Sequence, residues 1–337
     1  MKVLLTGGAG YIGSHTAVAL DAAGHAPVLY DNFCNSRRSV GERLSRILGH
    51  GVPLVEGDVR DVPRLTAVLR EHGIAAVIHF AGLKAVGESV EKPLEYFDDN
   101  VGGTIALLRA MRGAGVGILV FSSSATVYGA PQYLPLDEAH PTSATNPYGR
   151  TKLQIEEILS EVARADAALR VARLRYFNPV GAHDSGLIGE EPNGIPNNLM
   201  PYIAEVAAGL RPHLNVFGDD YPTPDGTGVR DYLHVMDLAE GHVAALAYLA
   251  AHPPGDFVCN LGTGRGTSVL ELAAAFAAAT GIAIPHRIAP RRPGDVPACY
   301  AKVDKARQEL GWTARRTLSE MCESAWRFQR NRRKPAD

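Results

Sequence analysis

The sequence predicts an α/β protein with a doubly wound parallel sheet, followed by a smaller, loop-rich C-terminal portion. Across residues 1–175, short apolar runs alternate with segments whose apolar residues recur at helical spacing, such as Leu65, Val68 and Leu69. This alternation is typical of a parallel sheet with helices on both faces, which binds ligands beyond the carboxyl ends of its strands. After Phe177 the chain contains long stretches rich in Gly, Pro, Asn and Asp, which in a compact protein are usually functional loops.

The predicted strands are short apolar runs, and each is followed by a polar or glycine-rich loop. In chain order they are Val3–Leu5, Ala26–Tyr30, Pro53–Val55, Ala76–Phe80, Ile118–Phe121 and Leu169–Leu174. One further strand, near Phe257–Leu261, is expected to return to the main sheet. The predicted division is therefore residues 1–176 for the sheet domain and 177–337 for a substrate-binding portion.

Composition and charge exclude several classes of function. The 337 residues carry a formal net charge of −2, so no basic surface for nucleic acid or anionic lipid is expected. Four cysteines without pairing or metal-binding spacing indicate a reduced, intracellular protein. No signal peptide and no apolar stretch of membrane-spanning length is visible, so we expect a cytoplasmic protein. The histidines form no HxH or HxxxH pair, and no metal site is predicted.

The first loop is rich in glycine: Thr6-Gly7-Gly8-Ala9-Gly10-Tyr11-Ile12-Gly13 follows the first strand, and a helical pattern comes next. Gly7, Gly10 and Gly13 allow a tight turn, close backbone approach to a pyrophosphate and close packing of the helix on the strand. The unpaired N–H groups of the helix then face the phosphates. This arrangement predicts a Rossmann-type dinucleotide site, although a glycine-rich turn without a ligand is the alternative interpretation.

Asp31 ends the second strand, 18 residues after Gly13, close to the spacing of about 20 residues expected for an acid that binds the ribose of NAD. A carboxylate there accepts from the 2′-hydroxyl and repels a 2′-phosphate, so NAD is favoured over NADP. Asp58 and Val59 follow the third strand, where a loop can reach the adenine. A surface turn is the competing interpretation of that loop.

Tyr148 and Lys152 lie four residues apart after Pro147, which suits the first position of a helix. A phenol has a pKa of about 10, so its use as a base near neutral pH requires a positive charge nearby. Lys152 and an oxidised nicotinamide would supply that charge. Ser124 ends the fifth strand, after Ser122 and Ser123, where its hydroxyl can bond to the same reacting oxygen.

The glycine-rich opening with Ser124, Tyr148 and Lys152 resembles the extended short-chain dehydrogenase/reductase superfamily. Longer motifs are similar to the UDP-glucose 4-epimerase family within it: GLKAVGESV, SSSATVYG, RYFNPVGAH, GIPNNLMPY and GTGVRDYLHVMDL. The likeness covers essentially the whole chain. It implies an NAD-dependent isomerase of galactose metabolism that interconverts UDP-glucose and UDP-galactose at C4 through a 4-keto sugar.

The resemblance also implies which residues bind the two ligands. The NAD-contacting positions are Tyr11, Ile12, Asp31, Asn32, Asn35, Ser36, Asp58, Val59, Phe80, Ala81, Gly82, Lys84, Ser122, Tyr148, Lys152 and Phe177. The UDP-hexose positions are Ser124, Tyr148, Phe177, Asn178, Asn198, Leu199, Asn215, Val216, Phe217, Arg230, Tyr232, Arg292, Asp295 and Cys299. Some relatives carry Asn at the position of Asp99, so Asp99 or the following Asn100 is expected at the cofactor. The helices around Val101–Met111 and Pro147–Ala163 resemble those through which the family forms a homodimer.

Three rival functions are distinguished by particular residues. A nucleotide-sugar 4,6-dehydratase resembles this chain, but that family carries an Asp-Glu pair directly after the strand-five hydroxyl, where this sequence has Ala125 and Thr126. A net NAD-dependent nucleotide-sugar dehydrogenase would exchange its cofactor, and the epimerase-like motifs disfavour it. A non-catalytic NAD-binding sensor would have no use for Ser124, Tyr148 and Lys152 together.

At Cys299 the sequence departs from the pattern of many family members, and this departure has the clearest consequence for substrate specificity. In the epimerase family this position borders the sugar pocket near C2, and relatives with Tyr there resemble enzymes restricted to glucose and galactose. Relatives with a small residue there tend also to accept N-acetylhexosamines. A thiol leaves open the volume that a phenol ring would fill, so the sequence predicts that UDP-GlcNAc and UDP-GalNAc are also substrates. The alternative is that Tyr300 occupies the gap.

Overall fold

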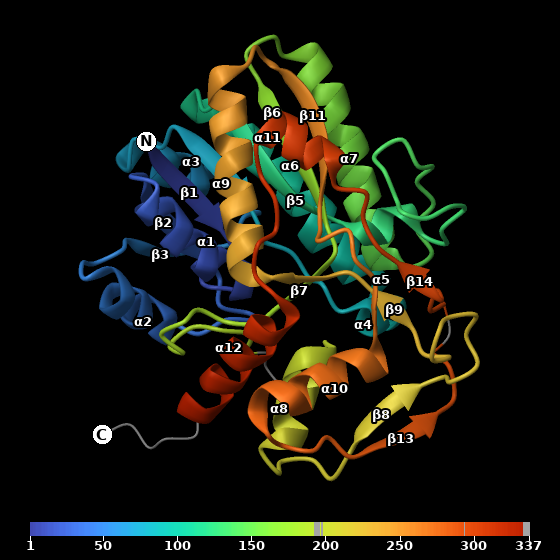
Figure 1. The fold of residues 1–337 in the computed structure, drawn as a ribbon. Helices are drawn as coiled ribbons and strands as arrows, with labels where there is room; N and C mark the ends of the chain where they lie inside the picture. The colour runs from blue at the N-terminus through green and yellow to red at the C-terminus, as the bar shows by residue number, and fades with distance from the viewer. Residues whose placement is uncertain (192–195, 197, 293, 333–337) are drawn as a thin grey trace.

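A seven-stranded parallel sheet forms the centre of the protein in the computed structural model, which describes residues 1–191, 196, 198–292 and 294–332 (Figure 1). Its strand order is β11-β6-β5-β4-β1-β2-β3. The strands are β1 (Lys2–Thr6), β2 (Ala26–Asp31), β3 (Leu54–Glu56), β4 (Ala76–His79), β5 (Ile118–Ser124), β6 (Arg170–Tyr176) and β11 (Gly255–Leu261). The six predicted N-terminal strands are confirmed, each starting within one residue of its predicted start, and β11 confirms the predicted returning strand.

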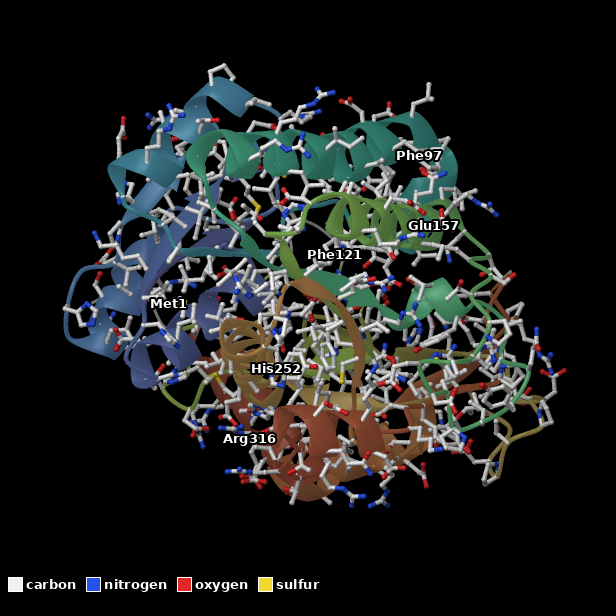
Figure 2. All side chains as sticks on the ribbon, turned by 90° about the horizontal axis from the view of Figure 1, so that it is seen from above. Met1, Phe97, Phe121, Glu157, His252 and Arg316 are labelled. Carbon is white, nitrogen blue, oxygen red and sulfur yellow. The ribbon has the colours of Figure 1, made fainter. Side chains whose placement is uncertain are left out.

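Helices cover both faces of this sheet because successive strand residues point to opposite sides. Val3 and Leu5 pack against one layer, whereas Leu4 packs against the other. The first layer contains α1 (Tyr11–Ala22), α2 (Ser39–Leu48), α9 (Val235–Ala251) and α11 (Asp304–Leu310), and the second contains α3 (Val62–Glu71), α6 (Gly103–Ala114) and α7 (Pro147–Ala165). Seen from above, Phe121 of β5 lies between these layers (Figure 2). The predicted doubly wound fold is therefore confirmed.

The C-terminal half contributes more to the main layers than the single predicted strand. Helix α9 packs lengthwise on α1, and β11 then pairs with β6. The buried apolar residues Leu238, Ala245 and Leu246 of α9 complete the core on that side of the sheet. The residues of α9 are apolar around most of the helix. This distribution fits its position between α1 and the sheet.

A second core lies beyond the carboxyl ends of the strands. Among its buried residues are Ile203, Val216, Phe276 and Cys322. Its helices are α8 (Leu199–Ala207), α10 (Val269–Thr280) and α12 (Leu318–Asn331). Three small sheets complete this portion: β7 (Asn178–Val180) with β10 (Tyr232–His234), β8 (Leu214–Phe217) with β13 (His286–Ala289), and β9 (Val229–Arg230) between β12 (Thr267–Ser268) and β14 (Ala298–Cys299).

Short helices connect β4 to α6 and β5 to α7. They are α4 (Val86–Glu91), α5 (Pro93–Tyr96), the π-helix η1 (Phe97–Gly102) and the 3-10 helix η2 (Ala125–Tyr128). Residues 192–195 and 197 lie outside the described residues. They belong to one of the predicted stretches rich in Gly, Pro, Asn and Asp after Phe177, and they include part of the GIPNNLMPY motif. Over the described ranges, no helix is both long and apolar enough to span a membrane.

Candidate functional site

A cleft of about 350 Å³ runs along the carboxyl ends of β1, β2, β4, β5 and β6. This is the edge at which doubly wound sheets bind their ligands. Most residues predicted to contact NAD line it: Gly7, Gly10, Tyr11, Ile12, Gly13, Asp31, Asn32, Asn35, Ser36, Asp58, Val59, Phe80, Ala81, Gly82, Lys84, Asp99, Tyr148, Lys152 and Phe177. The structure thus brings together residues that are up to 170 positions apart in the sequence.

The glycine-rich turn places backbone against backbone at the start of α1. Gly7 has φ +67°, and a Cβ there would lie 2.7 Å from the amide nitrogen of Ala81. Gly13 lies within the first turn of α1, which begins at Tyr11 and hence earlier than the sequence pattern predicts. A Cβ on Gly13 would lie 2.5 Å from the carbonyl oxygen of Gly7. These contacts keep the wall of the cleft free of side chains where a pyrophosphate would meet the helix N-terminus.

Asp31 is buried and closes the loop that follows β2. Its Oδ2 accepts from the amide of Ala9 (3.0 Å), and its Oδ1 accepts from the amide of Phe33 (2.9 Å) and from Ser36 Oγ (2.8 Å). Carboxylate oxygens can accept further hydrogen bonds, so the group remains suited to a ribose hydroxyl. Phe33 has φ +59°, a left-handed conformation that the sequence gives no reason to expect.

Asp58 and Asp99 lie on the adenine side of the predicted site and share a cation that the sequence analysis missed. Arg60 donates to Asp58 Oδ1 and Oδ2, both at 2.9 Å, and forms an ion pair with Asp99. The hydrogen bond from Arg60 lowers the pKa of Asp58 to about 2. Burial, by contrast, raises the pKa of Asp99. Asn32 joins this group by donating to Asp58 Oδ2 (3.1 Å).

Asn100 and Ser122 are placed behind the cleft rather than on its wall. Asn100 is buried; its Oδ1 accepts from the amide of Leu83 (2.7 Å), and its Nδ2 donates to the carbonyl of Leu83 (3.0 Å) and to Thr151 Oγ1 (3.0 Å). It therefore holds the loop that carries Gly82 and Lys84 against α7. Ser122 is also buried, and its carbonyl accepts from Lys152 Nζ (3.0 Å). Both residues position neighbours that line the cleft.

Ser124, Tyr148 and Lys152 meet on one wall of the cleft, where β5 ends and α7 begins. Asn146 caps α7 by accepting from the amide of Gly149 (2.8 Å), which fixes the first turn that carries Tyr148. The Ser124 hydroxyl lies close enough to that of Tyr148 to influence its pKa. Lys152 Nζ lies 6.0 Å from the centre of the Tyr148 ring. All three side chains are nearly enclosed, so any reacting group bound there is shielded from water.

Burial dominates the protonation of this group. It raises the pKa of Tyr148, and the hydrogen bond from Ser124 opposes that shift only in part. Burial lowers the pKa of Lys152 to about 8, with the Glu156 carboxylate opposing. Both shifts favour the neutral forms. In the protein alone Tyr148 is therefore a phenol at neutral pH, and a further positive charge in the cleft is needed before it can act as a base.

An ion-pair network that the sequence analysis missed lies behind this wall. Glu156 of α7 is buried and accepts from Ser123 Oγ (2.5 Å) and from Arg175 Nη2 (2.6 Å). Arg175 also donates to the hydroxyl of Tyr128 (3.2 Å). The network ties α7 to β5, β6 and η2, the elements around Ser124, Tyr148 and Lys152. In the sequence Glu156 lies in an ordinary charged helix pattern, so no local signal marks it as buried.

The residues predicted for the UDP-sugar fall into two groups. Ser124, Tyr148, Phe177, Asn178 and Asn198 line the main cleft, whereas Leu199, Asn215, Val216, Phe217, Arg230, Tyr232, Arg292, Asp295 and Cys299 do not. The second group lies on α8, on β8 to β10, on the segment that leads into β14 and on β14 itself. All of these residues belong to the C-terminal portion.

Within the second group, the guanidinium of Arg292 stacks 4.0 Å above the ring of Phe217. Arg230 lies beside Asp295 (3.5 Å) and donates to the carbonyl of Val296 (2.9 Å). The side chains of Val216 and Tyr232 belong to the second core, so Val216 can offer a ligand only its backbone.

Cys299 and Tyr300 face different surroundings. Cys299 pairs in register with Arg230 of β9 and packs with the cluster that contains Phe177. Burial raises the pKa of its thiol to about 11, so it is a neutral group near pH 7. The Tyr300 ring packs by Gly266, where a Cβ would lie 3.1 Å from its Cδ1.

The comparisons with known proteins agree with this geometry. The family model described as GDP-mannose 4,6 dehydratase matches residues 4–325. The UDP-glucose 4-epimerase of Mus musculus is 58% identical over 336 residues, which is 98% of this chain and 96% of the relative. The UDP-glucose 4-epimerase of Yersinia pestis is 56% identical over 330 residues, 98% of this chain and 97% of the relative.

Solved structures of related proteins are similar to this chain over nearly its whole length. The UDP-glucose-4-epimerase from Stenotrophomonas maltophila with bound NAD and formylated UDP-arabinopyranose has a TM-score of 0.97 at 56% identity and covers 98% of both chains. The enzyme from Bifidobacterium longum in complex with NAD+ and UDP has a TM-score of 0.95 at 52% identity, again over 98% of both chains.

The fold and the site define an enzyme of the extended short-chain dehydrogenase/reductase type that works with NAD. The matches over nearly the whole length make the assignment narrower: the chain belongs to the UDP-glucose 4-epimerase family. The predicted resemblance is thereby confirmed. Neither the dehydratase nor the net dehydrogenase is favoured by these comparisons.

We predict that Gly7→Ala prevents NAD binding. The new methyl group would lie 2.7 Å from the backbone of Ala81, and neither backbone segment can yield without moving the turn. The measurement is the NAD content of the purified protein, together with NAD binding by calorimetry.

Gly24→Ala is the matched control. Gly24 has a similar φ of +76°, but nothing lies within 4 Å of the added Cβ. This variant shares the cost of the left-handed backbone, about 1 kcal/mol, without the collision. Equal loss of NAD in both variants would contradict the prediction.

We also predict that Glu156→Ala lowers the free energy of unfolding by about 3–5 kcal/mol, since removal of one partner leaves Arg175 buried without its counter-charge. Urea denaturation followed by circular dichroism measures the change. Glu157→Ala, at the adjacent exposed position, is expected to change stability by less than about 0.5 kcal/mol. Similar effects of the two substitutions would show that the buried pair is not what stabilises α7.

Proposed function

We propose that the protein interconverts UDP-glucose and UDP-galactose at C4, using NAD. The observation that carries this proposal is the meeting of Ser124, Tyr148 and Lys152 on one enclosed wall of the cleft that the glycine-rich turn opens. The position after the strand-five hydroxyl carries Ala125 and Thr126, which have no acid–base chemistry for the elimination step of a dehydratase. The class of protein is an isomerase.

Within this proposal, residues 1–176 bind NAD and residues 177–337 bind the UDP-hexose. The turn from Gly7 to Gly13 receives the pyrophosphate, and Asp31 receives the adenosine ribose. NAD, when bound in its oxidised form, supplies a positive charge beside Tyr148 and acts as the acceptor, and later the donor, of the hydride. Arg230 and Arg292 offer forked donors to the diphosphate of the sugar nucleotide.

Tyr148 then acts as the base. As a phenolate it takes the proton from the C4 hydroxyl while hydride leaves C4, and Ser124 orients that hydroxyl by a hydrogen bond. Lys152 stabilises the phenolate and is held in place by the carbonyl of Ser122. The 4-keto sugar turns over while the diphosphate stays bound, so the UDP half provides binding energy remote from the reacting carbon. Tyr148 returns the proton when hydride is added to the other face.

Tyr148→Phe is predicted to abolish turnover while NAD stays bound, because the ring remains and only the hydroxyl is removed. The assay is conversion of UDP-galactose to UDP-glucose by the purified protein without added cofactor. Conversion without net NADH distinguishes the epimerase from a dehydrogenase and from a non-catalytic sensor. Near-normal activity of the variant would refute the assignment of Tyr148.

We further propose that UDP-GlcNAc and UDP-GalNAc are substrates. Cys299 packs against the cluster that contains Phe177, and the Tyr300 ring lies near Gly266. A thiol at position 299 occupies less volume than a phenol ring, and this difference supports room for an acetamido group next to the sugar. Cys299→Tyr is predicted to reduce turnover of UDP-GalNAc by about tenfold or more while UDP-galactose is still converted, since overpacking a filled site costs about 1–3 kcal/mol. A coupled assay with both substrates measures the ratio. Wild-type protein that epimerises UDP-galactose but not UDP-GalNAc would contradict this proposal.

We also propose that the protein is a cytoplasmic homodimer. The support for the dimer is the family's pairing through the helices that correspond to α6 and α7. The support for the location is that the four cysteines show no pairing pattern in the sequence.

A further inference from the structure

Glu190 lies where the predicted cofactor residues and the predicted sugar residues meet. Its side chain is 9% exposed, and it lines the main cleft. Oε1 accepts from Lys84 Nζ (3.1 Å) and from Asn198 Nδ2 (2.6 Å). Lys84 comes from the loop after β4, whereas Asn198 is the residue that precedes α8. One carboxylate oxygen therefore joins two elements that are more than 100 residues apart in sequence.

We propose that Glu190 is a positioning residue that couples the cofactor side of the cleft to the sugar side. The proposal rests on the proposed function, in which Lys84 contacts NAD and Asn198 contacts the UDP-sugar. Because both donors share the same oxygen, a shift of Lys84 toward bound cofactor changes the position available to Asn198, and the reverse also holds. Two ligands that act on a shared contact influence each other's affinity by the same factor.

The charges around Glu190 support a role in ligand binding. Burial disfavours the ammonium of Lys84, yet the charge and hydrogen bond of Glu190 raise its pKa above the ordinary value. Lys84 therefore stays a cation on the cleft wall, available to anionic ligands. Glu190 also adds to the effect of burial in raising the pKa of Tyr11, which keeps that hydroxyl protonated and able to donate to the carbonyl of Gly181 (2.7 Å).

The second oxygen, Oε2, is buried and has no hydrogen-bond partner among the residues that the structure describes. A purely structural carboxylate is normally satisfied on both oxygens, because an unpaired buried charge is costly. Glu190 and Tyr11 line both the main cleft and a small cavity of about 20 Å³, whose other lining residues include Gly181 and Gln329. The unused acceptor therefore lies behind the cleft wall, next to the oxygen that accepts from Lys84 and Asn198.

The adjacent Glu191 shows what a structural glutamate looks like at this place. It forms ion pairs with Arg37 (3.3 Å), Arg43 (2.8 Å) and Arg332 (3.5 Å). These contacts fasten the segment to the region around α2 and to the end of α12. Glu191 also lines the main cleft, but it has no hydrogen bond or ion pair with Lys84 or Asn198 among the described residues. It therefore serves as a matched control for loosening of the segment.

The test compares Glu190→Gln with Glu191→Gln in the full-length holoenzyme. Glu190→Gln retains the shape of the side chain but removes its charge. It is expected to raise the KM for UDP-galactose about tenfold while kcat changes less than about threefold, because uniform substrate binding is lost. A merely structural role would instead lower the active fraction, and with it kcat, at unchanged KM. Glu191→Gln is expected to lower the melting temperature and leave KM unchanged.

The second readout is the rate of NAD release with and without UDP. In the wild type UDP is expected to slow release, and in Glu190→Gln this effect should disappear. An unchanged UDP effect in Glu190→Gln would overturn the proposal. This measurement requires no turnover, so a wild type that binds both ligands without epimerising would refute the proposed function alone.

If Glu190→Gln does not fold, Glu190→Asp replaces it. The shorter side chain keeps the charge but cannot reach both donors, and it should weaken the UDP effect. Full retention of that effect in Glu190→Asp would also overturn the proposal.

Discussion

The burial of Tyr148 and Lys152 in one enclosed wall is the constraint on which the chemistry of the site depends. Burial raises the pKa of the phenol and lowers that of the ammonium to about 8, so it disfavours both the phenolate and the cation that would stabilise it. A third, positive charge must enter the cleft to reverse this. In the proposed mechanism the phenolate of Tyr148 therefore forms only when the oxidised cofactor is bound, which limits unproductive proton transfer in its absence.

Holding two such groups in place requires rigid support from behind. Glu156 and Arg175 fix α7 to the sheet, and Asn100 fixes the loop that carries Lys84. None of these three residues lies on the cleft wall. They act through others, by keeping the reacting side chains within the narrow geometric range that catalysis requires.

The parts of this arrangement that could be predicted are those with a local signature. The strands follow from apolar runs, the turn from its glycines, and the pair Tyr148 and Lys152 from helical spacing. The position of Asp31 follows from its distance to Gly13. Each of these patterns depends on neighbours close in sequence.

The parts that could not be predicted depend on long-range contacts. Glu156 and Glu190 are charged residues in unremarkable surroundings, and only the packing of distant elements buries them. Phe33 takes a left-handed conformation because Asp31 binds its amide, and no composition rule indicates this. The covering of α1 by α9 was missed for the same reason, since a helix shows its own apolar surface but not the partner that covers it.

The return of β11 to the sheet makes the two halves of the chain interdependent in folding. A fragment that ended at Tyr176 would leave β6 as an open sheet edge with seven unpaired residues, and the apolar side of α1 would lose α9. Exposed strand edges and apolar faces of this kind promote association between chains. During synthesis the N-terminal half therefore remains prone to aggregation until residue 261 has left the ribosome, although every residue of its glycine-rich turn is already present.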